Sequence, residues 1–436
     1  MFVALRQRNF ALLWLGGLIS TIGDWILNIG LPIYAYLLTR SVLVLSISIL
    51  LTSIPNIVLG SLAGVFVDRW DRKWTLIIVN GLLALGLLPL LFVRTADRIW
   101  IVYVVMLVEA SLEQFTIPAQ NALLPTLIQK AQLVQANALN SLTSDIARFI
   151  GPALGGLIAA IFALNGIVLA DVISFIVAAL LIGLISVTKA ASTESVDAQT
   201  EVKVTSHFWQ EWIDGLLVIR SERTLSVLVA TSAIMMLGEG VMSVLFPVFV
   251  YKVLHGQALQ IGQLMSAQAI GGLLGGLLIG VLGERITSRL MSRWSISLTC
   301  ITFGFGDLLI FNTPAFWPFY WVSVGLFIVV GVISIGRIGW QSLLQACSPD
   351  TYRGRIFGAL GMVTGLTYLV GTVAAGSLTD RLGVVTVLNL QAMGYMLAGI
   401  LVLVRLPRQQ ASIIESERVL QEILVPEEDE LLPPTR

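Results

Sequence analysis

Charged side chains are scarce in this chain of 436 residues, since only 12% of them are Asp, Glu, Lys or Arg. Soluble domains carry about 25%. Acidic and basic residues balance at 26 each, so the composition provides no basic surface for nucleic acid. Hydrophobic residues make up 56% of the chain, and its mean hydropathy is +0.89. A soluble core cannot enclose so much apolar surface, and we expect an all-α protein that crosses a membrane many times.

The chain is also poor in the side chains that hold metals or form disulfide frameworks. Its two cysteines, Cys300 and Cys347, lie in an apolar stretch and in a loop, and its two histidines, His207 and His255, lie in separate loops. The glycine-rich stretch 271–280 lacks the Lys-Ser/Thr pair of a phosphate-binding loop, so helix packing explains it better than ATP binding. We therefore expect no metal, no cofactor and no enzymatic activity.

A membrane-spanning helix needs about 20 mostly apolar residues. Twelve such stretches are present, at 10–38, 42–67, 75–94, 99–119, 138–162, 165–188, 224–251, 258–283, 291–311, 315–340, 356–378 and 383–405. The longest polar gap follows the sixth stretch. This predicts a six-helix bundle at 1–188, a cytoplasmic linker with an interfacial helix at 189–223, a second bundle at 224–405, and a disordered cytoplasmic tail at 406–436. Most Lys and Arg residues fall on one side if both termini are cytoplasmic, which predicts that orientation in a bacterial plasma membrane.

The two halves of the chain repeat one another. When they are aligned, Asp24 pairs with Glu239, Asn28 with Ser243 and Pro32 with Pro247. After a slightly longer loop in the second half, the alignment pairs Gly64 with Gly280, Asp68 with Glu284 and Arg69 with Arg285, and further along it pairs Gly151 with Gly371 and Gly156 with Gly376. Internal repeats of six helices are typical of secondary transporters, which rock around a central site.

Two motifs and three further segments resemble those of a known superfamily. The loop motif Gly64-x-x-x-Asp68-Arg69-x-Asp71-Arg72-Lys73 resembles that of the major facilitator superfamily, and Gly151-Pro152-Ala153-Leu154-Gly155-Gly156 resembles the motif of its antiporters. The segments at 9–14, 23–25 and 118–125 resemble the macrolide-efflux and enterobactin-exporter-like branch of the drug:proton antiporters. The resemblance covers about residues 5–405 and implies twelve helices in two pseudo-symmetric bundles, alternating access, and export of a drug-like amphipathic molecule in exchange for protons. It does not specify the substrate. A siderophore or lipid-like metabolite is an alternative cargo, and uptake by symport is a further alternative.

Ionisable residues inside the membrane are costly unless they are paired or hydrated, so they indicate function. We expect Asp24 to bind and release the coupled proton, assisted by Glu109 and Glu113. The alternative for Asp24 is a structural, hydrogen-bonded carboxyl. Of the two glutamates, one is expected to be protonated or paired with Arg148. Many drug:proton antiporters carry an arginine in the fourth span, where this chain has the two glutamates instead.

Two further groups of residues have expected roles. The first, fourth, seventh and tenth spans line the central cavity of the resembled fold, and helical phase turns their polar stripes the same way. The expected substrate cavity consists of Trp25, Asn28, Arg148, Met235, Met236, Glu239 and Ser243. The expected conformational latch consists of Asp68, Arg69, Arg72, Glu284 and Arg285. Asp171 and Asp307 are expected to be structural, because their spans are peripheral in the resembled fold. The expected partners are a small-molecule substrate, protons and the bilayer, for a monomeric protein.

Overall fold

The structure is a computed structural model, and it describes residues 4–129, 132–186, 216–282, 293–316, 320–333, 336–348 and 353–406. Every regular element in these ranges is a helix. The predicted interfacial helix lies largely outside the described residues. Glu284, Arg285 and the tail beyond residue 406 also lie outside them.

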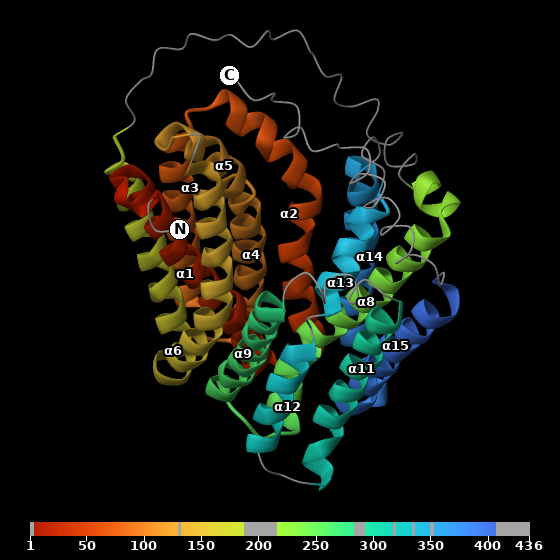
Figure 1. The fold of residues 1–436 in the computed structure, drawn as a ribbon. Coiled ribbons are helices and arrows are strands. Elements are labelled where there is room, and N and C mark those ends of the chain that lie inside the picture. The colour runs from red at the N-terminus through yellow and green to blue at the C-terminus, as the bar shows by residue number, and fades with distance from the viewer. Residues whose placement is uncertain are drawn as a thin grey trace, which may run out of the picture.

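The first group of helices, from the N-terminal half, packs together (Figure 1). It contains α1 (Arg8–Thr39), α2 (Val42–Arg69), α3 (Arg72–Leu87), α4 (Ile99–Glu113), α5 (Thr116–Leu127) and α6 (Leu133–Gly183), with short 3-10 turns at Ala4–Arg6, Leu88–Phe92 and Ala96–Arg98. The helical run of α6 breaks at Ala163, where φ is 50° and ψ is −146°. This break falls at the predicted boundary between the fifth and sixth stretches.

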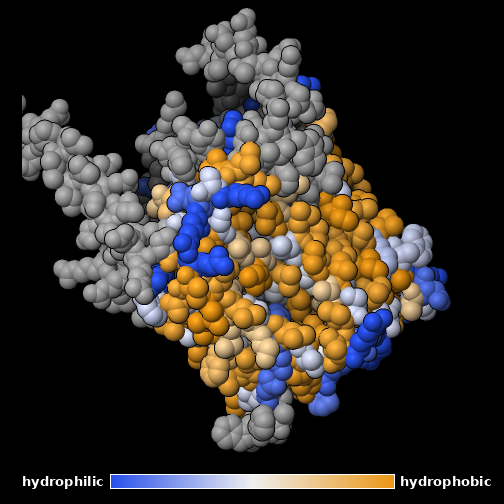
Figure 2. All heavy atoms as spheres, turned by 90° about the vertical axis from the view of Figure 1, so that its right-hand side faces the viewer, coloured by the Kyte–Doolittle hydropathy of each residue, from blue (hydrophilic) through white to orange (hydrophobic). Residues whose placement is uncertain are grey.

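The second group of helices comes from the C-terminal half. It contains α8 (Arg223–Lys252), α9 (Ala258–Leu282), α11 (Arg293–Phe316), α12 (Tyr320–Ile333), α13 (Gly336–Ala346), α14 (Arg353–Leu382) and α15 (Val384–Arg405). In the described residues, 8 helical segments are long and apolar enough to cross a membrane. One predicted single span, 99–119, is divided into α4 and α5. Figure 2 shows hydrophobic residues over most of the visible surface, as expected of side chains that face lipid.

Short-range contacts fix the turn between α2 and α3. The side chain of Asp71 accepts a hydrogen bond from the Trp74 amide at 2.9 Å and so caps the start of α3. Lys73 Nζ donates to the carbonyls of Gly183 and Ile185, at 2.9 and 2.7 Å, and so caps the end of α6. Two charges of the loop motif therefore hold the first helix group together at the end that carries the N-terminus.

The hydrophobic clusters show where the two groups meet. One cluster joins both groups, and it includes Ile33 and Tyr36 of α1, Leu45 of α2, Phe249 of α8 and Ile261 of α9. All of these positions lie at the end of the helices away from the N-terminus. At the N-terminal end each group has its own cluster instead, one within α1–α6 and the other within α8–α15 and the helical residues just before them. The described residues of the two groups thus share one apolar core at one end only.

The contacts across this shared end follow the sequence repeat. A Cβ added to Gly156 would lie 2.7 Å from the Ala258 carbonyl oxygen and 3.2 Å from Gly262 Cα, on α9. A Cβ added to Gly376, the equivalent of Gly156, would lie 2.9 Å from Ser46 Cβ, on α2. Ser46 is in turn the equivalent of Gly262, in the register that pairs Gly64 with Gly280. Equivalent small residues therefore bring α6 against α9 and α14 against α2, so the repeat extends to the contacts between the halves.

Candidate functional site

Four carboxyls from three helices gather in the first group. Asp24 lies about midway along α1, which extends from Arg8 to Thr39. It interacts electrostatically with Glu113, Asp171 and Glu109. We call these four residues the acid cluster. Three of its members are the predicted proton-coupling residues, which the structure brings together.

Asp171 is the member that the sequence did not predict. It is fully buried on the second part of α6, and its Oδ1 accepts a hydrogen bond of 3.0 Å from Ser174 Oγ. It approaches Asp24 because residue 23 is glycine: a Cβ at Gly23 would collide with the side chains of both Asp171 and Ser174. The peripheral position expected of Asp171 therefore does not keep it away from the coupling residues. The sequence did contain a signal for Asp171, because it is an ionisable residue within an apolar stretch.

Several oxygens of the acid cluster are buried without a hydrogen-bond partner among the described residues. They are Asp24 Oδ1, Glu109 Oε1 and Asp171 Oδ2. Buried polar atoms in proteins nearly always have a partner, and those that have none among the protein groups are commonly met by water or by a functional ligand. The cluster is therefore an unusual concentration of unmet acceptors.

Arg148 does not join this cluster in the structure. Its side chain is exposed, and it is not among the electrostatic neighbours of Asp24 or Glu109. The structure does not describe the side chain of Asp145, the acidic residue three positions before Arg148 on α6. The pairing of Arg148 with a glutamate thus finds no support, and Arg148 remains available to a solute.

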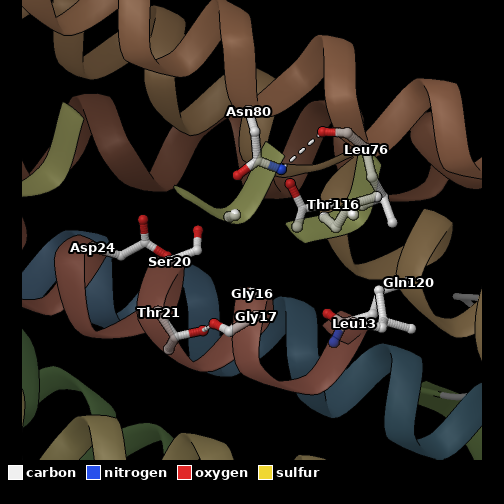
Figure 3. A pocket seen from close by; sticks show the side chains of 12 residues that line it. Leu13, Gly16, Gly17, Ser20, Thr21, Asp24, Leu76, Asn80, Thr116 and Gln120 are labelled. Carbon is white, nitrogen blue, oxygen red and sulfur yellow. Dashed lines mark hydrogen bonds between the residues drawn. The ribbon is translucent and has the colours of Figure 1, made fainter. Parts of the chain in front are cut away.

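A pocket of about 50 Å³ adjoins the acid cluster inside the first helix group (Figure 3). Its polar side chains are Ser20, Thr21 and Asp24 of α1, Asn80 of α3, and Thr116 and Gln120 of α5. Asp24 and Ser20 face Asn80 and Thr116 across it. The remaining lining also comes from the first group, including Ala178 and Ile182 of α6. The polar stripe of α1 was expected to face a cavity between the halves; most of it turns instead into a pocket within one half.

The expected substrate-cavity residues differ in exposure. Asn28, Arg148 and Glu239 are exposed, whereas Trp25, Met235, Met236 and Ser243 are half-buried. Trp25 is held by the antiporter motif, since a Cβ at Gly151 would collide with its side chain. The hydroxyl of Ser243 donates a hydrogen bond to the Gly240 carbonyl at 2.9 Å, within its own helix. A contact between Ser243 and the solute stays a prediction.

The antiporter motif packs α6 against two neighbours. Gly155, like Gly151, faces α1, where an added Cβ would lie 3.2 Å from Ile26 Cα. Gly156 and the Pro152 carbonyl face α9 of the other half. The motif therefore connects the helix that carries Asp24 to the contact between the halves. In the expected latch, Arg69 and Arg72 are exposed, while the structure says nothing of the Asp68 side chain.

The second group contains a related but different arrangement of polar residues. Asp307 is buried on α11, accepts a 3.0 Å hydrogen bond from Gln391 Nε2, and interacts electrostatically with Glu239. Gln391 is the equivalent of Asp171, in the register that pairs Gly151 with Gly371. Among the described residues, no group of three or more His, Cys, Asp or Glu side chains is arranged to hold a metal ion.

Comparison with known proteins places the chain. A family model described as "Transmembrane secretion effector" matches residues 1–430. The chain belongs to this family, and it is an exporter of the major facilitator superfamily. It is 26% identical over 381 residues to macrolide efflux protein A of Streptococcus pyogenes, which covers 87% of this chain and 91% of that protein.

Two further comparisons extend the likeness. The chain is 22% identical to the enterobactin exporter EntS of Citrobacter koseri, over 91% of each chain. Among solved structures, a bacterial homologue of the iron transporter ferroportin in its inward-facing state gives a TM-score of 0.68 at 17% identity, covering 91% of this chain and 98% of that one. This structural likeness shows the fold and nothing of the solute. The predicted superfamily and the predicted direction of transport are confirmed.

Proposed function

We propose that this exporter is a proton antiporter that expels a large amphipathic molecule by alternating access. Proton entry through the acid cluster would drive the export. The proposal includes twelve spanning helices in two pseudo-symmetric bundles, both termini in the cytoplasm, and a monomer in the bacterial plasma membrane.

The acid cluster is the observation that carries the proposal. Two of the four carboxyl residues are buried and two are half-buried, so they cannot all be charged so close together without a large cost. Their electrostatic neighbours include no cation among the described residues. Protons relieve that cost. A cluster that gains and loses protons changes the charge inside the first half, and this provides a means of biasing one conformation over the other.

The shared core at one end supports alternating access. With the N-terminus in the cytoplasm, the two halves are closed against each other on the outer side, and each has a separate core on the inner side. This state is suited to receiving cargo from the cytoplasm or the inner leaflet. The cross-half contacts at Gly156 and Gly376 would separate when the outer side opens.

The names of the relatives support two cargo classes. One is a macrolide-like drug, from the likeness to macrolide efflux protein A, and the other is a siderophore, from the likeness to an enterobactin exporter and to a staphyloferrin A transporter of Staphylococcus aureus. The exposed guanidinium of Arg148 favours the second class, because it would attract an anionic solute. Both classes use the same coupling mechanism.

Liposomes with the purified protein, a pH-sensitive dye inside and an imposed proton gradient test the proposal. Erythromycin and enterobactin would be added separately to wild type, to Asp24→Asn, and to the control Asp97→Asn, which alters an exposed carboxyl outside the acid cluster. We expect solute-dependent proton movement in wild type and the control, and its loss in Asp24→Asn. Solute transport without proton movement, or full coupling in Asp24→Asn, would contradict proton antiport through this site.

A further inference from the structure

The pocket beside the acid cluster is elongated along α1. It begins at Asp24 and extends along α1 to Leu13, which is about 16 Å nearer the N-terminal end at 1.5 Å per residue. Leu76 near the start of α3 and Ile182 near the end of α6 line the same end of the pocket. The pocket therefore runs from the middle of the helices toward the end that the Lys73 contacts close.

The interior of the pocket suits water. Asp24 Oδ1, Asn80 Oδ1 and Thr116 Oγ1 all line it, and all three are buried atoms without a hydrogen-bond partner among the described residues. A site needs about 10–15 Å³ and two to four polar partners to hold a water molecule. A volume of about 50 Å³ with these lining atoms therefore has room for a short chain of waters.

The N-terminal end of the pocket is apolar. Leu13, Leu76 and Ile182 belong to the hydrophobic cluster of the first half, and each is at most 3% exposed. Their side chains separate the polar part of the pocket from the surface at this end. Gln120 reaches into the same region, since a Cβ at Gly17 would lie 3.1 Å from its Nε2 atom.

The pocket is built from one half alone, whereas the substrate cavity is expected between the halves. We propose that this pocket is the path by which protons travel between Asp24 and the N-terminal end of the first half, separate from the path of the substrate. A proton arriving along the waters binds the Asp24 carboxylate and leaves by the same waters when the carboxyl ionises. Leu13, Leu76 and Ile182 gate the path. The carboxyls that face Asp24 are Glu109 and Glu113 of α4 and Asp171 of α6.

A separate path has a functional consequence. A bulky cargo in the central cavity would not stop protons from reaching the acid cluster, so proton binding and cargo binding need not compete for access. The inference rests on the proposed function, because it assumes that Asp24 carries the coupled proton.

Infrared measurement of hydrogen–deuterium exchange tests the path without transport. The purified protein is transferred to D2O, and the exchange rate is taken from the carboxylic C=O band that disappears in Asp24→Asn. Asn80→Leu and Thr116→Val remove pocket polarity at nearly constant side-chain size, and Leu76→Ala opens the apolar end. Thr143→Val is the matched control, since its buried hydroxyl donates to the Leu139 carbonyl at 3.1 Å and does not line the pocket.

We expect exchange to be at least tenfold slower in Asn80→Leu and Thr116→Val, faster in Leu76→Ala, and unchanged in Thr143→Val. Asn28→Leu, at an exposed position expected in the central cavity, should have no effect. Slower exchange in Asn28→Leu but not in the pocket variants would overturn the proposed path, and so would exchange at the wild-type rate in all of them. If no band disappears in Asp24→Asn at any pH, Asp24 carries no proton and the proposed function itself fails, which distinguishes the two failures.

Discussion

Gly156 offers a direct way to change the balance between conformations. In Gly156→Ala the new methyl would lie 2.7 Å from the Ala258 carbonyl oxygen, and ordinary van der Waals contact begins at 3.4 Å. The neighbouring atoms of α9 are backbone and cannot rotate away. The two helices must therefore separate by about 0.7 Å at this point, or the halves must part.

Overpacking of this kind costs about 1–3 kcal/mol. The cost falls on the state whose halves touch at the end away from the N-terminus, and a state in which they part there would escape it. A difference of about 1–3 kcal/mol changes the ratio of the two states about 5- to 150-fold. Gly156→Ala should therefore populate the state that is open at that end.

Spin labels on the two halves, at the ends of α2 and α14 where they meet, report this ratio as a distance distribution in detergent and in lipid. Gly276→Ala is the control, because it adds the same methyl to α9 where no atom lies within 4 Å. We expect longer distances in Gly156→Ala and wild-type distances in Gly276→Ala. Gly376→Ala, at the equivalent contact with Ser46, should act in the same direction. Identical distributions in Gly156→Ala and Gly276→Ala would refute the reasoning.

Two other outcomes follow from the structure. Gly23→Ala should lower the thermal unfolding midpoint by an amount equivalent to about 1–3 kcal/mol, because its methyl collides with Asp171 and Ser174. The control Gly81→Ala should leave the midpoint unchanged, since no atom lies within 4 Å of the added methyl. Equal midpoints in the two variants would contradict the close approach of α1 and α6. Burial, reinforced by the nearby Glu222 carboxylate, raises the pKa of the Cys347 thiol to about 11 from its usual 9.0. At pH 8, maleimide should therefore label Cys347 about 100-fold more slowly than an unperturbed thiol. The labelling rate should increase as the pH rises toward 11, and it should be higher in Glu222→Gln. Labelling in a Cys300→Ser background measures this rate, and a rate at pH 8 equal to that of a free thiol would contradict the burial of Cys347.

The extent of most helices was predictable because apolar length alone determines it. The first predicted span, 10–38, corresponds to α1 at Arg8–Thr39, and the break at Ala163 falls between two predicted spans. The interruption between α4 and α5 was missed although the sequence contains its cause. Pro118 lacks the N–H that would bond to the Gln114 carbonyl, and its ring crowds that carbonyl, so α4 ends at Glu113.

The sequence singled out three of the four residues of the acid cluster, but it did not indicate how the four would be arranged. Helical phase placed Ser20, Thr21 and Asp24 on one face of α1, and the structure agrees that they share a face. Which neighbours that face would meet depends on tertiary packing, and phase does not contain it. The place of Asp171 in the cluster also depends on tertiary packing, because Asp171 can lie close to α1 only where Gly23 has no side chain.

The two halves have equivalent contacts with each other but different surroundings for their buried carboxyls. Gly156 and Gly376 make equivalent contacts with the opposite half. At the position equivalent to Asp171, however, the second half has Gln391, whose amide donates to Asp307 and so gives that buried carboxyl a partner. In the first half, Asp171 has such a donor in Ser174, whereas Asp24 Oδ1 has no partner among the described residues. A carboxyl that already has a donor gains less from a proton than one that has none. This difference supports the proposal that Asp24, in the first half, carries the coupled proton.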